Sequence, residues 1–268
     1  MFNGWKHLSI MATILVLIIR LYRLLPYKLR VKLYRPLEAF CRVLDGKSLP
    51  ITRHFNGFSL ALDLGEKTDR GIFIAKPYEK PVTDFVSETL TAGDTFIDVG
   101  ANVGYYAALA SSKGANVIAL EPDAVSYAKL CKNVPGHCLR AAAGDENGTT
   151  TLHINPLNRG GNSILPFDSY KTGDTHFTRK QIESRFSELE QTVEMVRLDS
   201  LITTPVKLVK IDVEGFEYQV LKGMEDAFHL VENIVCEVTN YRDAIIDLLD
   251  FHGFRLVSGG RDLIFTKV

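Results

Sequence analysis

Cysteine is scarce in this chain of 268 residues, which holds four. No two of them form a C-x-x-C pair, and none has a histidine at the spacing of a zinc ligand. A disulfide-stabilised scaffold or a cysteine zinc site needs a denser pattern. We therefore expect reduced thiols, mostly in the core. They are Cys41, Cys131, Cys138 and Cys236.

An excess of charge of one sign is also missing, since 31 Lys and Arg stand against 32 Asp and Glu. Near-neutrality argues against a protein whose whole surface binds nucleic acid. Glycine and proline are too few for a collagen-like or low-complexity chain. Hydrophobic residues make up 46% of the sequence, enough for a folded core. The length fits one large domain or two small ones.

The charge is unevenly spread along the chain. Residues 1–45 carry eight basic side chains and two acids, a net charge of +6, and the rest has a net charge of −7. This segment includes an uncharged apolar run, residues 8–19, followed by tyrosines among Lys and Arg. We expect residues 5–35 to associate with a membrane surface. The division predicts an N-terminal segment, 1–45, and a domain, 46–268.

The apolar run has 12 residues, fewer than the roughly 20 that cross a bilayer core. Snorkelling arginines could extend it to about residues 5–25. A buried helix of the domain and a cleaved signal peptide are the alternatives, although no small-residue cleavage site follows. If the segment inserts, the bases after it place the domain on the cytoplasmic side.

After residue 50 the pattern alternates between strands and helices. Asn56-Gly57 predicts a hairpin turn, and residues 206–213 form the clearest buried strand. Such alternation predicts a doubly wound α/β domain with a mostly parallel sheet, closed by a C-terminal hairpin that adds an antiparallel edge strand. The expected strands are 94–100, 115–122, 137–143, 149–156, 192–201, 206–213 and 232–239, and the expected helices are 81–91, 103–112, 123–134, 214–228 and 241–253.

The first strand of the domain ends in a glycine turn, Gly100-Ala101-Asn102-Val103-Gly104, preceded by Asp98. The spacing is G-x-N-x-G and not the dinucleotide G-x-G-x-x-G. A carboxylate at this turn repels a diphosphate but attracts the ammonium and sulfonium of S-adenosylmethionine. Glu121, at the end of the next strand, can accept hydrogen bonds from both ribose hydroxyls. Asp145, after the third strand, can contact the adenine edge.

Several runs of the sequence resemble FkbM-type S-adenosylmethionine-dependent methyltransferases. They are FIDVGANVGYYAAL (96–109), VIALEPD (117–123), AAAGDENG (141–148), VRLDSL (196–201) and VKIDVEGFEYQVLKGM (209–224). The resemblance implies a class I methyltransferase (Rossmann-like) fold and O-methylation of a hydroxyl on a sugar or a natural product. It puts Asp98, Gly100, Asn102, Gly104 and Glu121 at cofactor-contacting positions.

A second group of acids lies at the ends of two expected strands: Asp212 and Glu214 at the end of 206–213, and Glu237 two residues before the end of 232–239. Strand alternation puts Lys210 and Asp212 on one side. A carboxylate here can hold the acceptor hydroxyl or take its proton, or join a metal site that lowers the hydroxyl's pKa. We rank Asp212 first, Glu214 second and Glu237 third as catalytic residues.

Other candidates are weaker. The histidines form no H-x-x-x-H pair, so we expect no dedicated histidine metal site. His176, in a predicted lid, is an outside candidate for a base. Asn162 and Ser163, in the same loop, are expected near the acceptor.

The sequence thus predicts a membrane-associated O-methyltransferase with S-adenosylmethionine as cofactor and a sugar, glycolipid or natural product as acceptor. The alternatives are an NAD(P)-dependent oxidoreductase on a Rossmann-like fold and a non-catalytic membrane-tethered binding module. The acidic domain argues against nucleic acid as a partner.

Overall fold

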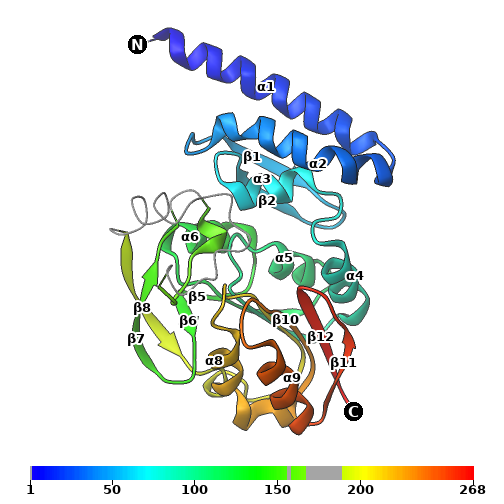
Figure 1. Ribbon diagram of the computed structural model, residues 1–268, viewed down its shortest axis with the longest axis vertical. Helices are drawn as coiled ribbons and strands as arrows, with labels where there is room; N and C mark the ends of the chain where they lie inside the picture. Colours follow the sequence, from blue (N-terminus) through cyan, green and yellow to red (C-terminus); the bar gives the residue numbers. More distant parts are fainter. Residues whose placement is uncertain (1, 156–157, 167–188) are drawn as a thin grey trace.

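The computed structural model describes residues 2–155, 158–166 and 189–268. A seven-stranded sheet runs through its centre (Figure 1). Its strands lie in the order β11-β12-β10-β9-β3-β4-β5, and β5, β4, β3, β9 and β10 are parallel neighbours. The predicted class I methyltransferase-like fold is confirmed. The strands are β3 (Thr95–Val99), β4 (Asn116–Leu120), β5 (His137–Leu139), β9 (Val206–Ile211), β10 (Val231–Glu237), β11 (Phe254–Ser258) and β12 (Asp262–Lys267).

The C-terminal hairpin adds an antiparallel edge strand to the sheet, as predicted. Its second strand, β12, is antiparallel to both β10 and β11 and lies between them, so the edge strand is β11. The burial pattern explains this, because Leu263, Ile264 and Phe265 of β12 are all buried whereas most of β11 is exposed.

Two hydrophobic clusters cover the two faces of the sheet. Phe96 and Leu208 face one cluster, and their neighbours Ile97 and Val209 face the other, as alternation along a strand requires. Helices α4, α5 and α6 pack on the first face, and α8 and α9 on the second. The helices are α4 (Lys80–Thr89), α5 (Tyr105–Ser112), α6 (Ala124–Asn133), α8 (Glu217–Lys222) and α9 (Arg242–Phe251).

A smaller sheet of three strands lies beside the main one, in the order β6-β8-β7. The single strand expected over 137–143 therefore divides between two sheets, with β5 in the large sheet and β6 in the small one. The strands of the small sheet are β6 (Ala141–Ala143), β7 (Gly148–His153) and β8 (Glu190–Val196). The 3-10 helices of the described chain are η1 (Arg42–Leu44), η2 (Arg159–Gly161), η4 (Leu198–Ser200) and η5 (Glu225–Leu230).

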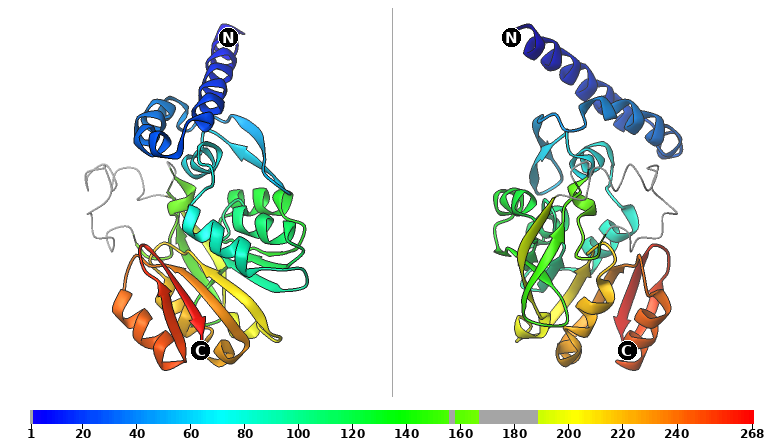
Figure 2. Two further views of the ribbon diagram at one scale, coloured as in Figure 1. Left: turned by 90° about the vertical axis from the view of Figure 1, so that its right-hand side faces the viewer. Right: turned by 60° about the vertical axis from the view of Figure 1, so that its left-hand side comes forward.

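The N-terminal residues form a helical layer at one end of the molecule (Figures 1 and 2). It comprises α1 (Phe2–Leu24), α2 (Tyr27–Cys41), the predicted hairpin β1 (Pro50–His54) and β2 (Ser59–Asp63), and α3 (Lys67–Ile74). Leu15, Ile19 and Leu37 are buried in the same cluster as Phe96 and Leu208 of the main sheet. In the described part of the chain, no helix has the length and apolarity to span a bilayer.

Candidate active site

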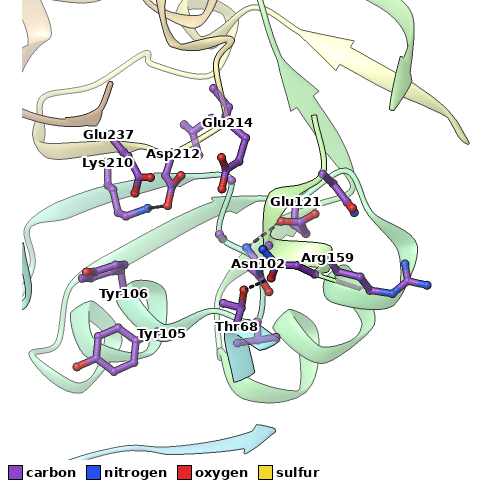
Figure 3. Close-up of a pocket in the computed structure, with 18 of the residues that line it drawn as sticks. Thr68, Asn102, Tyr105, Tyr106, Glu121, Arg159, Lys210, Asp212, Glu214 and Glu237 are labelled. Carbon is purple, nitrogen blue, oxygen red and sulfur yellow. Dashed lines mark hydrogen bonds and ion pairs between the residues drawn. The ribbon is translucent and has the colours of Figure 1, made fainter. Parts of the chain in front are cut away.

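A cavity of about 560 Å³ lies where the parallel strands of the main sheet end. Doubly wound sheets bind their ligands at this edge. The cavity's floor is formed by the glycine loop after β3, the residues after β4, and the ends of β9 and β10. Its opposite wall comes from α2, α3 and residues 75–79. Figure 3 shows Glu121 and Asn102 toward one end and the acids Asp212, Glu214 and Glu237 toward the other.

The glycine loop is pressed against the end of β9. Gly100 has φ +76°, and a Cβ at this position would lie 1.9 Å from the carbonyl oxygen of Asp212. Only glycine fits there, and the loop and Asp212 therefore hold a fixed relative position. Gly104 does not line the cavity: a Cβ would meet Leu130 of α6 and Val134, the residue after this helix, at 2.7 Å, so this glycine allows close helix packing.

Asp98 lies beneath the loop and not on the cavity wall. Its side chain is 1% exposed and accepts a hydrogen bond from the Ala107 N–H, 3.1 Å away, in α5. Lys210 Nζ lies 3.9 Å from its other oxygen. Burial raises the pKa of Asp98 to about 6, and the Lys210 charge opposes this shift. The carboxylate thus ties β3, α5 and β9 together, and contact with the cofactor remains a prediction.

Glu121 does line the cavity, next to Asn102. One carboxylate oxygen accepts the Asn102 N–H and the other the Asp123 N–H, each at 2.8 Å. Burial raises the pKa of Glu121 to about 8. The side chain therefore fixes the glycine loop against the end of β4 and offers oxygens to a ligand, as a ribose-binding acid would.

Asp145, the expected adenine contact, is exposed and lies outside the cavity. Ala141, Ala142 and Ala143 of β6 line the cavity instead. Small side chains leave room for a flat ring, and the division of the third predicted strand is what brings them there.

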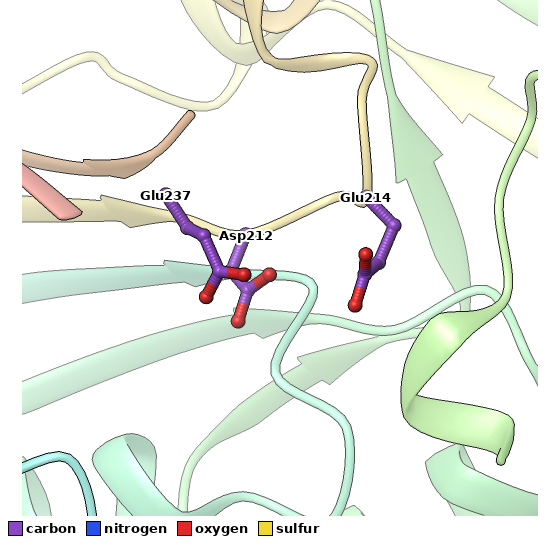
Figure 4. Close-up of side chains that lie close together, drawn as sticks. All are labelled: Asp212, Glu214 and Glu237. Carbon is purple, nitrogen blue, oxygen red and sulfur yellow. The ribbon is translucent and has the colours of Figure 1, made fainter. Parts of the chain in front are cut away.

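Asp212, Glu214 and Glu237 converge (Figure 4), and one carboxylate oxygen from each lies within 4.8 Å of the others. Asp212 follows β9 directly, and Glu237 ends β10. Glu214 was expected to open a helix. Instead it has φ +51° in a turn, and α8 begins three residues later.

Positive charges neighbour this acidic cluster. Lys210 Nζ lies 3.3 Å from Asp212 Oδ2, and Arg261 forms an ion pair with Glu237. Burial, reinforced by the charge of Asp212, raises the pKa of Glu214 to about 8 and that of Glu237 to about 9. The three oxygens could ligate a hard cation, but two basic side chains already offset their charge.

An aromatic wall that the sequence analysis did not predict lies beside these acids. Tyr106, at the start of α5, donates a hydrogen bond of 2.7 Å to Glu79, and Lys210 Nζ lies 5.0 Å from the centre of its ring. Tyr78 and Tyr105 complete the wall. Only the tyrosine pair after the glycine loop hinted at it, because residues 78–79 reach the site through tertiary packing.

A strap, residues 158–163, crosses the cavity from the small sheet. Asn158 accepts a hydrogen bond of 2.9 Å from Thr68 of α3. Arg159 forms an ion pair of 2.9 Å with Asp123, and Ser163 donates a bond of 2.8 Å to the Glu214 carbonyl. Asn162 and Ser163 line the cavity, as their predicted site role requires. His176 lies outside the described residues.

Comparison with known proteins gives one family. The model of the "Methyltransferase FkbM domain" matches residues 98–256. The chain is 30% identical over 198 residues to a 31-O-demethyl-FK506 methyltransferase, FkbM, of Streptomyces tacrolimicus, covering 63% of this chain and 75% of that protein. It is 28% identical over 169 residues to the hexuronic acid methyltransferase AglP of Haloferax volcanii, covering 60% of this chain and 62% of that protein.

Proposed function

Because the chain belongs to the FkbM methyltransferase family, we propose that it moves the methyl group of S-adenosylmethionine to a hydroxyl oxygen of a sugar or a natural product. The predicted family, enzyme class and cofactor are confirmed. The chemical class of the acceptor is the part that we propose. Two relatives support it, since one is a hexuronic acid methyltransferase and the other a 31-O-demethyl-FK506 methyltransferase.

One observation carries the proposal: the glycine loop and the acidic cluster share one cavity and touch through Gly100 and Asp212. A cofactor on the loop would place its methyl group within reach of the cluster. The acceptor oxygen attacks the methyl carbon, the carbon–sulfur bond breaks, and its electron pair stays on sulfur. Alignment of the three atoms supplies much of the acceleration.

The acceptor's proton is assigned to Asp212. Lys210 Nζ, 3.3 Å from Asp212 Oδ2, holds this carboxylate in place. Burial raises the pKa of Glu214 to about 8, so its protonated form is favoured at neutral pH and can donate a hydrogen bond. This side chain is therefore suited to hold a further oxygen of the acceptor, while Glu237 is ion-paired with Arg261.

The test is a comparison of two aspartate variants. Asp212→Asn should lower kcat by about 100-fold or more, the usual contribution of a general base, while S-adenosylmethionine still binds in calorimetry. Asp247→Asn, an exposed position on α9, should change neither. Full turnover by Asp212→Asn would show that Asp212 does not take the acceptor's proton. Absence of cofactor binding by the unaltered protein, or tight NAD(P) binding, would favour the binding module or the oxidoreductase.

We also propose where the protein resides. Exposed apolar and basic side chains on α1 and α2 support a position of these two helices in the plane of the membrane surface. The anionic cytoplasmic leaflet attracts Lys and Arg. Their excess in residues 1–45 therefore supports attachment on that side.

A further inference from the structure

We propose that the acceptor is a polar group carried by a lipid, and that it enters the cavity while α1 and α2 rest on an anionic bilayer. This inference rests on the methyl transfer proposed above. It names the substrate class that the geometry of the N-terminal layer favours.

The first observation is an apolar stripe on α1 that the described residues of the chain leave exposed. Its members recur every three or four residues and so share one side of the helix. Leu17 and Leu21 are each 56% exposed. The opposite side of α1, with Leu15, Ile19 and Tyr22, is buried against the body. The exposed stripe is Ile14, Leu17, Ile18, Leu21 and Leu24.

The second observation is that α2 and the turn after it continue this surface and add charge. Exposed apolar side chains and exposed bases follow one another around the same helix. The apolar ones are Leu29, Val31, Leu33, Phe40 and Val43, and the bases are Lys28, Lys32, Arg35 and Arg42. Apolar and basic stripes side by side match the interface of an anionic bilayer. A second copy of the chain would bring bases against bases, which argues against self-association here.

The third observation joins this surface to the active site. The inner side of α2 carries Tyr34 and Glu38, and both line the cavity that holds the acidic cluster. A helix with its side chains is about 10 Å across. The cavity wall and the lipid-facing side are therefore two sides of one helix, α2. An acceptor free in solution gains nothing from this arrangement, whereas a headgroup on a lipid anchor is brought to the cavity.

Binding to vesicles tests the surface. The full-length protein should sediment with phosphatidylcholine vesicles that contain phosphatidylglycerol, and much less with phosphatidylcholine alone or in high salt. The double variant Leu17→Glu/Leu21→Glu should lose at least 10-fold in vesicle affinity. Phe251→Glu is the matched control, since this phenylalanine is 85% exposed on α9, at the other end of the molecule. Equal binding by the double variant and the control would overturn the proposed surface.

Partition of a labelled product tests the acceptor. The protein is incubated with methyl-labelled S-adenosylmethionine and a total extract of its source cells, which is then divided between chloroform–methanol and water. Label in the lipid phase, reduced at least 10-fold by Leu17→Glu/Leu21→Glu, is the expected result. Label only in water-soluble glycans would refute the lipid anchor and leave methyl transfer intact. No label in either phase would refute both.

Discussion

At the scale of single residues, the site depends on acids placed where water is excluded. Glu121 accepts hydrogen bonds from two backbone N–H groups and lines the cavity, whereas Asp98 is buried beneath the glycine loop and does not line it. The sequence predicted both acids from their positions at strand ends, but not which one faces the ligand. Strand alternation sends Asp98 toward α5, and only the loop that follows reaches the cavity. That difference depends on packing and not on spacing.

Glu121 yields a prediction about pH. Its pKa is raised to about 8 by burial, and a carboxylate that accepts two ribose hydroxyls must be ionised. Ligand affinity should therefore rise with pH up to about 8 and fall by as much as tenfold per pH unit below it. Methylthioadenosine is the probe, because it keeps the ribose and lacks the cofactor's ammonium. Calorimetry between pH 6 and 9 should show this slope.

Glu121→Gln is the control for that measurement, since it keeps the shape of the side chain and cannot ionise. The variant should bind methylthioadenosine weakly and without the slope. A slope that persists in Glu121→Gln would assign the titration to Glu214 or Glu237, whose pKa values are also raised.

At the scale of elements, the hydrophobic pattern of the sequence predicted the strands correctly where they are buried in the main sheet. The predicted strands 94–100 and 206–213 are β3 and β9, and Asp123 caps α6 by accepting the Ser126 N–H at 3.0 Å, as expected of a helix start. The pattern was misleading at 214–228, where a left-handed turn delays the helix. Glu214 and Gly215 both have positive φ there, a property of the chain's path that apolar spacing does not reveal.

The strap, residues 158–163, gives the element-scale prediction. Arg159 and Thr68 hold it to α6 and α3, so loosening it should expose the cofactor end of the cavity. Arg159→Ala should raise the dissociation constant of S-adenosylmethionine by about tenfold, roughly 1.4 kcal/mol, mainly through faster release. Stopped-flow measurement of the off-rate checks this.

A double-mutant cycle separates the strap from a direct contact. Thr68→Val alone should act in the same direction as Arg159→Ala, and the double variant should lose less than the sum of the two, because both remove one restraint. Strictly additive effects would mean that Arg159 acts on the ligand independently of the strap.

At the scale of the whole molecule, the core includes side chains from before the predicted boundary at residue 45, and the boundary itself stays a prediction. Leu15 and Ile19 of α1 belong to the same buried cluster as strands of the main sheet. Composition showed that the N-terminal segment is basic and apolar, and this suggested a separate attachment. It could not show that one side of the helix packs on the domain, because an amphipathic helix has the same sequence pattern whether its apolar residues meet protein or lipid.

Two neighbouring residues of α1 separate these uses of the helix. Leu15 is 3% exposed and Ile14 is 52% exposed, so Leu15→Ala should lower the free energy of unfolding by about 2–5 kcal/mol, whereas Ile14→Ala should change it by less than about 0.5 kcal/mol. Denaturant unfolding without lipid measures both. In vesicle sedimentation Ile14→Ala should show the weaker binding, in proportion to the apolar area removed.

If Leu15→Ala proved as stable as the unaltered protein, α1 would be an independent anchor and residue 45 a true boundary. If neither variant bound vesicles differently, the exposed stripe would have a partner other than lipid.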